Sequence, residues 1–304
     1  MVALSFLNTS EYSIQQPTNG IIQMVKLALL KDSPIDKVHA RLNDEIVIGD
    51  KRGYLGMSVI GHKCHRYLQF VHYGCLKPTY NQRIDRLFSD GHNAEPQLIE
   101  ALGLIGIKVH DEQKQVVGIT GHVQGHIDGN GYWVSDEYAL FNAKSFLVEF
   151  KTHNQKSFDE LLKNELPKCK PLHYAQMVSY MGHQKQEVGL YVAKNKNTSE
   201  IHIRVVDFDE SHFDDLRRKE VEIVTADTLL PRIGNDSPKW FECKMCGAAD
   251  VCFGKKSIEH DCRNCKHVDV LDGGRWLCNI TGKIIDDHSP CEQYSVGEMF
   301  DCTN

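Results

Sequence analysis

The sequence predicts a mixed α/β protein, in which a mixed central sheet is flanked by helices and a small cysteine-rich module follows at the C-terminus. Two observations predict the α/β part. Apolar residues recur at three- and four-residue spacings in some stretches and form short β-branched runs in others, and these patterns are typical of helices and strands. A third observation predicts the module, because eight of the 11 cysteines lie within the last 62 residues.

Composition and charge narrow the class of protein. The chain has 304 residues, of which 41% are hydrophobic and 25% are charged, and its formal net charge is −6. These values are typical of globular proteins and argue against disordered, collagen-like or coiled-coil chains. No apolar run suits an export signal or a membrane span, so we expect a cytoplasmic protein with no membrane partner. Cytoplasmic thiols stay reduced, and clustered cysteines therefore indicate metal binding.

The first well-marked element is a helix over residues 83–102. Apolar residues such as Leu98 and Leu102 recur there at helical spacing, which places them on one face. Gly91 and Pro96 are expected to bend or divide the helix.

Strands and helices follow in the rest of the chain. Runs of β-branched residues predict strands at 105–109, 116–119, 122–128, 146–150, 188–192 and 201–206. Helical spacings predict helices at 157–162, 172–181 and 211–224. The four strands between 105 and 150 look like a β-meander. Because helices separate the later strands, we expect a mixed sheet with helices on its faces.

Charged residues gather at the ends of two predicted strands. Asp128 ends one strand, and Glu149 and Lys151 lie one residue apart on the next. Because side chains alternate along a strand, Glu149 and Lys151 share a face, whereas Phe150 points to the opposite, apolar face. Carboxylate and carbonyl oxygens suit Mg²⁺ or Mn²⁺, so Asp128, Glu149 and the Phe150 carbonyl are candidate ligands. Lys151 could then orient or deprotonate a water, or neutralise charge on a phosphoryl group.

Residues on a neighbouring helix support a catalytic interpretation over a merely solvated strand face. Gln176 and Tyr180 lie four apart and therefore share a helix face, from which they could hold a phosphate or orient Lys151. His173 lies one turn before Gln176 and is a further candidate, although a histidine on a helix is often only packed or solvated.

Four motifs together resemble the PD-(D/E)XK nucleases of the RecB type, which include phage exonucleases and CRISPR-associated relatives. The motifs are Gly91-x3-Glu95, Gly-x-Ile-Asp128-Gly, Glu149-Phe-Lys151 and Gln176-x3-Tyr180. Longer stretches at 54–67, 149–158 and 170–177 resemble phage proteins of this kind, so the resemblance covers about residues 53–291.

The resemblance implies a restriction-endonuclease-like core and a Mg²⁺- or Mn²⁺-dependent deoxyribonuclease, most simply an exonuclease in phage recombination, replication or DNA degradation, within the bacterial host cytoplasm. It implies these catalytic residues: Asp128, Glu149, Lys151, Gln176 and Tyr180. Glu95 would be a further metal ligand, in the place where many relatives have a histidine, whereas His92 is off register. A non-catalytic DNA-binding or scaffold module, a redox sensor and an endonuclease of the same superfamily are the alternatives.

A first group of cysteines, Cys243, Cys246 and Cys252, is one thiolate short of a closed metal site. In RecB-type nucleases with an iron–sulfur clasp, the fourth thiolate comes from an N-terminal cysteine, and the context of Cys64 is similar. The resemblance therefore implies a 4Fe-4S cluster on these four cysteines. Zinc on the same ligands is the alternative, and Cys75 is another possible fourth ligand.

A second group of cysteines has the spacing of a zinc ribbon: Cys262, Cys265, Cys278 and Cys291. Four thiolates at such spacings are typical of structural Zn²⁺ sites. His288 is the closest rival to Cys291 as the last ligand, and such a ribbon usually serves structure or docking. Cys169 and Cys302 are expected to be spare thiols.

DNA is the expected partner, bound through its phosphate backbone without strong sequence specificity. The negative net charge argues against a generally basic DNA-coating protein, but lysines concentrate near the proposed site. The candidate DNA contacts are Lys144, His153, Lys156 and Lys170. A recombination or replication protein is a possible further partner, and an oligomer is possible.

Three domains are expected. Residues 1–50, with a helix-like stretch at 21–30, have no assigned role, residues 51–255 form the nuclease domain, and residues 256–304 form the zinc-binding module.

Overall fold

The computed structural model describes residues 34–49, 52–135, 137 and 139–301. The predicted helix at 21–30 and Cys302 lie outside these residues. The chain divides into two compact units, Met1–Val47 with Thr79–Leu87 and Ile48–Pro78 with Phe88–Asn304. The three domains expected from the sequence stay a prediction.

The first unit contains helix α2 (Pro34–Asn43) and most of a two-stranded sheet of β1 (Ile46–Ile48) and β3 (Thr79–Asn81). Helix α4 (Gln82–Leu104) begins in this unit. Arg86 donates to the Leu42 carbonyl over 2.7 Å and thereby ties α4 to the end of α2.

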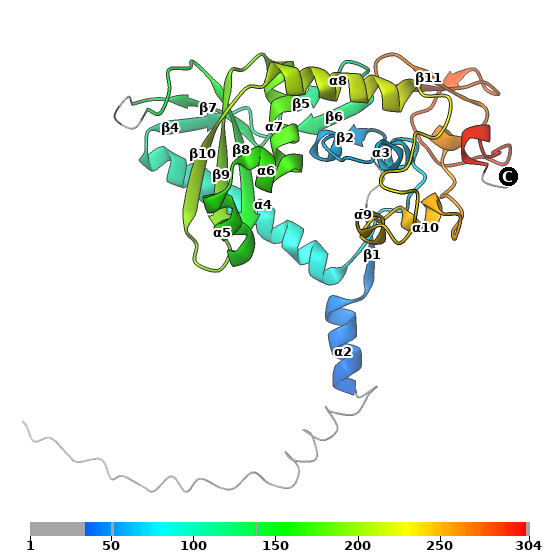
Figure 1. The fold of residues 1–304 in the computed structure, drawn as a ribbon, viewed down its shortest axis with the longest axis horizontal. Coiled ribbons are helices and arrows are strands. Elements are labelled where there is room, and N and C mark those ends of the chain that lie inside the picture. The colour runs from blue at the N-terminus through cyan, green and yellow to red at the C-terminus, as the bar shows by residue number, and fades with distance from the viewer. Residues whose placement is uncertain (1–33, 50–51, 136, 138, 302–304) are drawn as a thin grey trace, which may run out of the picture. The chain divides into compact units, whose positions relative to one another are not determined.

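A five-stranded mixed sheet forms the centre of the second unit (Figure 1). Its strands, in spatial order, are β10 (Ile201–Asp207), β9 (Val188–Asn195), β8 (Phe146–His153), β7 (Gly129–Trp133) and β4 (Ile107–His110). β8 and β9 are parallel, and the other pairs are antiparallel. The predicted mixed α/β class is therefore confirmed.

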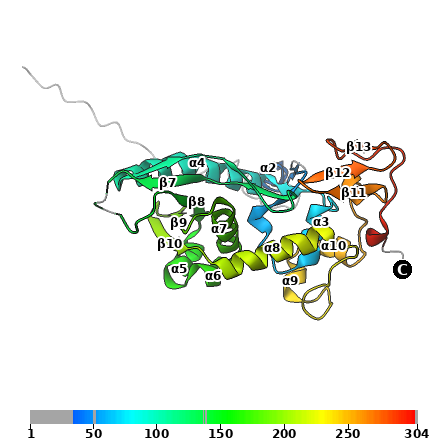
Figure 2. The same ribbon diagram turned by 90° about the horizontal axis from the view of Figure 1, so that it is seen from above.

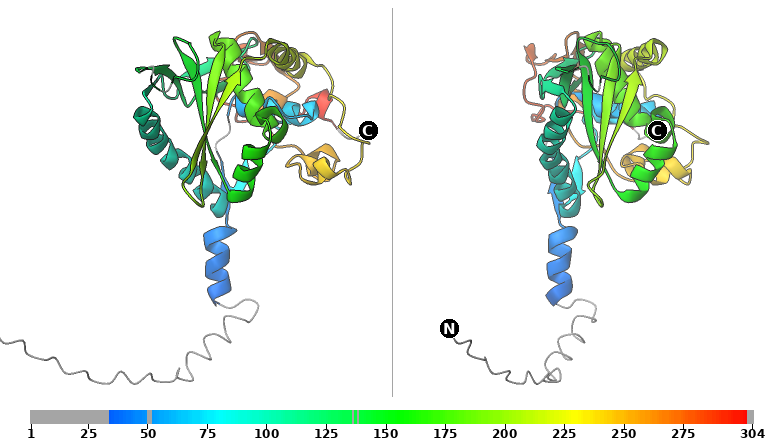
Figure 3. Two further views of the ribbon diagram at one scale, coloured as in Figure 1. Left: turned by 60° about the vertical axis from the view of Figure 1, so that its left-hand side comes forward. Right: turned by 90° about the vertical axis from the view of Figure 1, so that its left-hand side faces the viewer.

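Helices cover both faces of this sheet, and each face has its own apolar core. On one face, α5 (Gln155–Lys163) and α7 (Pro171–Gln184) pack on residues such as Leu147 and Tyr191. On the other face, residues 88–104 of α4 pack on Phe146 and Val148. Figure 3 shows the sheet between α4 and the α5–α7 side. The arrangement agrees with the nuclease-like core that the sequence predicts.

The predicted β-meander is wrong. β5 (Gln115–Val117) and β6 (Val123–His126) leave the central sheet and join β2 (Leu55–Gly56) in a separate sheet, in the order β2-β6-β5. In the central sheet, β7 lies between β4 and β8 instead. The sequence did not predict β7 because it contains Gly129 and Gly131, and glycine is depleted in strands. At Gly131 the strand tolerates the missing side chain because the Phe146 ring occupies that space.

Helix α4 is not divided by Pro96 but continues to Leu104. α7 lies between the central sheet and α8 (Glu210–Thr225) (Figure 2). α8 begins before the predicted position because Asp209 caps it, accepting from the His212 amide over 2.9 Å. α8 also packs on α3 (His65–His72).

The C-terminal region is built from short elements. They are α9 (Phe241–Lys244), α10 (Ala249–Cys252), η2 (Cys262–Asn264) and η3 (Glu298–Phe300). Two other short helices, η1 (Met57–Val59) and α6 (Leu166–Cys169), lie earlier in the chain. A three-stranded sheet of β11 (Val268–Leu271), β12 (Arg275–Cys278) and β13 (Lys283–Ile284) carries the predicted ribbon. The Gly273 and Gly274 amides donate to the Thr120 carbonyl over 3.1 Å, so the β11–β12 turn docks on the β5–β6 loop.

Within the described ranges, no helix combines the length and the apolar character needed to cross a membrane.

Candidate active site and cysteine centres

Asp128 lies between β6 and β7 and is fixed by the neighbouring strand. Its Oδ2 accepts a hydrogen bond from the Phe150 amide over 2.7 Å. Just before it, Gly125 lies against the Tyr180 hydroxyl, and any Cβ at this position would overlap that oxygen. The Gly-x-Ile-Asp-Gly motif therefore has a packing reason as well as a chemical one.

Glu149 and Lys151 project from β8 on the face opposite Phe150, as the alternation predicts. Phe150 packs in the core beneath α4. The Lys151 Nζ donates to Glu149 Oε1. The other oxygen, Glu149 Oε2, is buried and has no hydrogen-bond partner among the described residues. Because a buried charged oxygen without a partner is costly, this atom needs a proton or a cation.

Three carboxyl groups at this place, those of Glu95, Asp128 and Glu149, have raised pKa values. Burial, together with the negative charge of Asp128, raises the pKa of Glu149 to about 7. Burial raises the pKa of Asp128 as well, and burial with the Asp128 charge raises that of Glu95. Glu95 projects from α4, Asp128 lies between β6 and β7, and Glu149 lies on β8, so three separate segments contribute to the group. We name Glu95, Asp128, Glu149 and Lys151 the carboxylate site.

Lys151 within the site and His92 beside it both change the charge balance of the carboxylates. Burial lowers the pKa of Lys151, but the charges of Glu149 and Asp128 outweigh that effect and raise it overall, so this lysine is a cation. His92, which hydrogen-bonds the Phe88 carbonyl over 2.9 Å, lowers the pKa of Glu95 and Asp128 when it is charged. His92 is thus near the site, although its register in the sequence differs from that of the metal-binding histidine in the nucleases that the motifs resemble.

Gln176 and Tyr180 lie on the buried face of α7. The Tyr180 hydroxyl donates to the His126 carbonyl over 3.0 Å and is hydrogen-bonded to the Gln176 side chain. Burial raises the pKa of Tyr180, so its hydroxyl stays protonated. This pair joins α7 to the chain just before Asp128.

His153, Tyr191 and His173 form a hydrogen-bonded chain beside Lys151. The Tyr191 hydroxyl lies 2.8 Å from His153 Nε2 and 2.7 Å from His173 Nδ1. Burial, followed by nearby lysines, lowers the pKa of His153 to about 4 and that of His173 to about 3, and both rings are therefore neutral at neutral pH. Sequence reasoning missed Tyr191, which becomes a neighbour of Glu149 only through the β8–β9 register.

The candidate DNA contacts differ in their availability. Lys144 and Lys156 are exposed. Lys170 is paired with Glu160 over 2.7 Å, with its side chain 11% exposed. His153 has both ring nitrogens engaged, since Nδ1 also meets the Ser157 hydroxyl at 2.9 Å. The exposed lysines are therefore the better candidates for phosphate contact.

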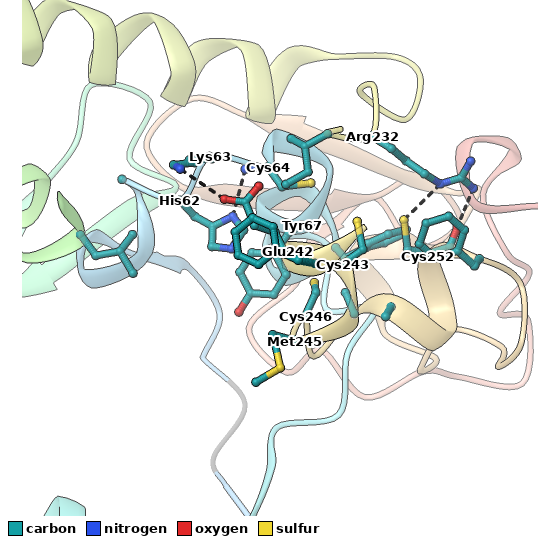
Figure 4. Close-up of a pocket in the computed structure, with 18 of the residues that line it drawn as sticks. His62, Lys63, Cys64, Tyr67, Arg232, Glu242, Cys243, Met245, Cys246 and Cys252 are labelled. Carbon is teal, nitrogen blue, oxygen red and sulfur yellow. Dashed lines mark hydrogen bonds and ion pairs between the residues drawn. The ribbon is translucent and has the colours of Figure 1, made fainter. Parts of the chain in front are cut away.

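The first group of cysteines surrounds a cavity of about 330 Å³. Its members come from widely separated parts of the chain (Figure 4): Cys64, Cys243, Cys246 and Cys252. We name them the cavity cysteines. Burial, followed by the neighbouring thiols, raises the pKa of Cys243 and Cys246. Cys75 lies elsewhere, 3.8 Å from the Asn264 side-chain nitrogen, and does not line the cavity.

The second group of cysteines surrounds the start of the three-stranded sheet. Burial, Asp261 and then the other three thiols raise the pKa of Cys262 to about 11, so each of the three lies near enough to Cys262 to act on its charge. We name Cys262, Cys265, Cys278 and Cys291 the ribbon cysteines. The rival ligand His288 lies against Gly53, where its Nε2 would be 2.8 Å from a Cβ.

The chemical nature of the donor atoms, though not their arrangement, suits the metals that the sequence predicts. Hard divalent ions prefer carboxylate oxygens, and Glu149 Oε2 is such an oxygen, buried and without a partner in the described part of the chain. Backbone amides of Thr281 and Ile280 donate to the Cys278 sulfur, and that of Ala248 donates to Cys246; such bonds favour thiolates. No three or more His, Cys, Asp or Glu side chains among the described residues form a ready-made metal site.

Comparisons with known proteins give only distant structural similarity. No family model matches the sequence, and no curated protein does. The chain is similar to the alkaline exonuclease LHK-Exo from Laribacter hongkongensis, at 16% identity over 62% of this chain and 90% of that one, with a TM-score of 0.41. LHK-Exo in complex with dAMP gives 14% identity over 56% and 86% of the two chains, and SSO0001 gives 15% over 78% and 98%, each with a TM-score of 0.41. These values do not assign the chain to a family.

Proposed function

We propose that the protein is a metal-dependent nuclease that hydrolyses DNA phosphodiester bonds, and specifically an exonuclease. One observation carries the proposal: the charges of Glu149, Asp128 and Glu95 all act on the cationic Lys151, and one buried oxygen of Glu149 has no partner within the described residues. The motif resemblance to RecB-type nucleases supports the choice of DNA.

The divalent ion would be held by the carboxylate site. Asp128, Glu149 and Glu95 would supply carboxylate oxygens, and Phe150 its carbonyl. When bound, Mg²⁺ or Mn²⁺ would polarise a phosphoryl oxygen and lower the pKa of a water molecule. Because Asp128 accepts a hydrogen bond from the Phe150 amide, β8 fixes one of the ligands before any ion binds.

Lys151 would stabilise negative charge rather than accept a proton. Its pKa is raised by Glu149 and Asp128, so it carries a positive charge at neutral pH. A cation beside the metal ligands can orient the attacking water and neutralise charge that develops on the phosphoryl oxygens. Tyr180 and Gln176 would hold the chain before Asp128 in place.

The substrate backbone would be bound by lysines outside the carboxylate site. Lys144 and Lys156 are both exposed. Lys144 lies just before β8, and Lys156 lies in the first turn of α5, the helix that follows β8. Contacts to phosphates position a nucleic acid without reading its sequence, so we expect little sequence specificity.

The two cysteine groups would hold separate metal centres. We assign a 4Fe-4S cluster to the cavity cysteines, supported by the cavity that they line and by the resemblance of Cys64 and its neighbours to an iron–sulfur clasp. We assign Zn²⁺ to the ribbon cysteines, supported by their spacing and by amide donors to Cys278.

Digestion of end-labelled DNA tests the proposal. Anaerobically purified protein with Mn²⁺ would be given linear DNA labelled at its 5′ or 3′ end and a closed circle, and compared with Asp128→Ala and Lys151→Ala. We expect loss of the linear DNA only, with both variants inactive. Cutting of circles would make the protein an endonuclease. If the wild type binds DNA and Mn²⁺ without cutting either substrate, it is a non-catalytic binding module.

A further inference from the structure

Arg232 makes a two-point contact with one of the cavity cysteines (Figure 4). Its Nε donates to the Cys252 sulfur over 3.3 Å. Its Nη2 donates to the carbonyl of the same residue over 2.6 Å. A guanidinium fork that spans the sulfur and the carbonyl of one cysteine fixes that side chain at the end of α10.

The remaining side of the guanidinium is also held. Nη1 donates to Asp236 Oδ1 over 2.9 Å, and the group lies 4.7 Å from the centre of the Phe253 ring. Arg232 and Phe253 both line the cavity, and the Arg232 side chain is 26% exposed. Arg232 is therefore pre-positioned and partly shielded from water, which strengthens its effect on a neighbouring charge.

A metal centre on four thiolates carries excess negative charge. Hydrogen bonds to ligand sulfurs and the charge around a cluster set its stability and reduction potential. Among the residues that line this cavity, Arg232 donates a side-chain hydrogen bond to a cysteine sulfur, and it brings a full positive charge. The neighbouring cation Lys63 is instead paired with Glu242 over 3.2 Å.

We propose that Arg232 is a positioning residue for the metal centre of the cavity cysteines, which it stabilises through the Cys252 sulfur. The inference rests on the centre assigned above. It predicts slower loss of metal with Arg232 present. For an iron–sulfur cluster it also predicts a higher reduction potential, because the added electron increases the negative charge that Arg232 offsets.

Two substitutions and one control test this role. Arg232→Gln removes the charge, whereas Arg232→Lys keeps the charge but loses the fork. Arg218→Gln is the matched control, because Arg218 forms an exposed ion pair with Asp215 on α8. The proteins would be purified anaerobically and loaded with iron and sulfide. Iron content, the rate of iron loss to a chelator, and the midpoint potential in a dithionite titration would then be measured.

We expect iron loss to be about 10- to 100-fold faster in Arg232→Gln than in the wild type, as for other residues that hydrogen-bond a metal ligand. The reduction potential of the cluster should be lower in Arg232→Gln than in the wild type. If the loss of the charge disfavours the reduced cluster tenfold, the potential falls by about 59 mV for a one-electron couple. The rate of iron loss and the potential of Arg232→Lys should lie between those of Arg232→Gln and the wild type. Both values for Arg218→Gln should match those of the wild type. Equal loss rates and potentials in all four proteins would overturn the role of Arg232 alone. A wild type that holds no metal at the cavity cysteines would overturn the proposed centre and this inference together.

Discussion

The carboxylate site and the cavity cysteines gather ligands in opposite ways. Glu149 and Lys151 sit on a long central strand between parallel and antiparallel neighbours, and Asp128 is bonded to that same strand. The cavity cysteines instead come from the start of α3, from the two short helices α9 and α10, and from the turn between them. The first site is part of the sheet, whereas the second joins short elements around a cavity.

This difference predicts different consequences of losing the metal. A sheet with an apolar core on each face should keep its structure when the carboxylate site is empty, and burying like charges there costs stability until an ion binds. Helices of four residues make few internal hydrogen bonds, so α9 and α10 should depend on their metal for structure.

The largest effect is expected from Glu149→Gln. Activity should fall by at least about 10²–10³-fold, the usual cost of losing one electrostatic stabiliser of a transition state, while the metal-free protein becomes more stable because a buried repelling charge is removed. Nuclease assays and denaturant unfolding measure the two changes.

The matched control is Glu220→Gln, which alters a buried carboxylate that accepts hydrogen bonds from Thr120. It should retain nuclease activity. Comparable activity loss in both variants would mean that Glu149 acts only through the general stability of the fold.

A smaller and local effect is expected from Cys64→Ser. The variant should lose the metal of the cavity cysteines, and limited proteolysis should then cut between about residues 231 and 261, because α9 and α10 lose their cross-link to α3. The central sheet should stay protected. Cys169→Ser is the control, since Cys169 lies apart from both cysteine groups and approaches the Asn164 carbonyl at 3.7 Å. Cleavage within the central sheet would contradict the local role.

The smallest effect is expected in the pH dependence of two quantities, which change in opposite directions: the stability of the metal-free protein and its affinity for Mn²⁺. The pKa of Glu149 rises from 4.5 to about 7 on folding, so between these values the folded chain binds more protons than the unfolded chain. The stability of the metal-free protein should therefore fall as pH rises from about 4.5 to 7, by on the order of 3 kcal/mol. Mn²⁺ affinity should instead rise, up to about tenfold per pH unit, because binding releases the proton.

Unfolding and Mn²⁺ titrations at several pH values would measure both trends. Glu149→Gln should flatten them. An unchanged slope in that variant would assign the proton to another group.

Local patterns in the sequence predicted the features that depend on neighbouring residues. The alternation of Glu149, Phe150 and Lys151 predicted which side chains share a face, and the structure places Phe150 in the apolar core and the other two together. The mixed sheet with flanking helices also followed from such patterns.

Features that depend on distant pairing were missed. β6 pairs with β5 on one side and, on the other, with a two-residue strand at Leu55 that no pattern marks. This pairing made the predicted meander wrong. Tyr191 reaches the site through the β8–β9 register. Arg232 reaches Cys252 from twenty residues away, across a stretch that contains α9 and most of α10. Sequence spacing carries no information on either contact.

Counting bound Mn²⁺ and cleaved phosphodiester bonds in the same samples tests the central claim most directly. Mn²⁺ is a hard ion that prefers carboxylate oxygens to thiolates, so electron paramagnetic resonance would report the carboxylate site. We predict that the wild type binds Mn²⁺ and cleaves linear DNA, that Asp128→Asn loses both, and that Lys151→Met keeps the ion but loses cleavage. Full Mn²⁺ binding and cleavage by Asp128→Asn would contradict the assignment of the carboxylate site as the active site.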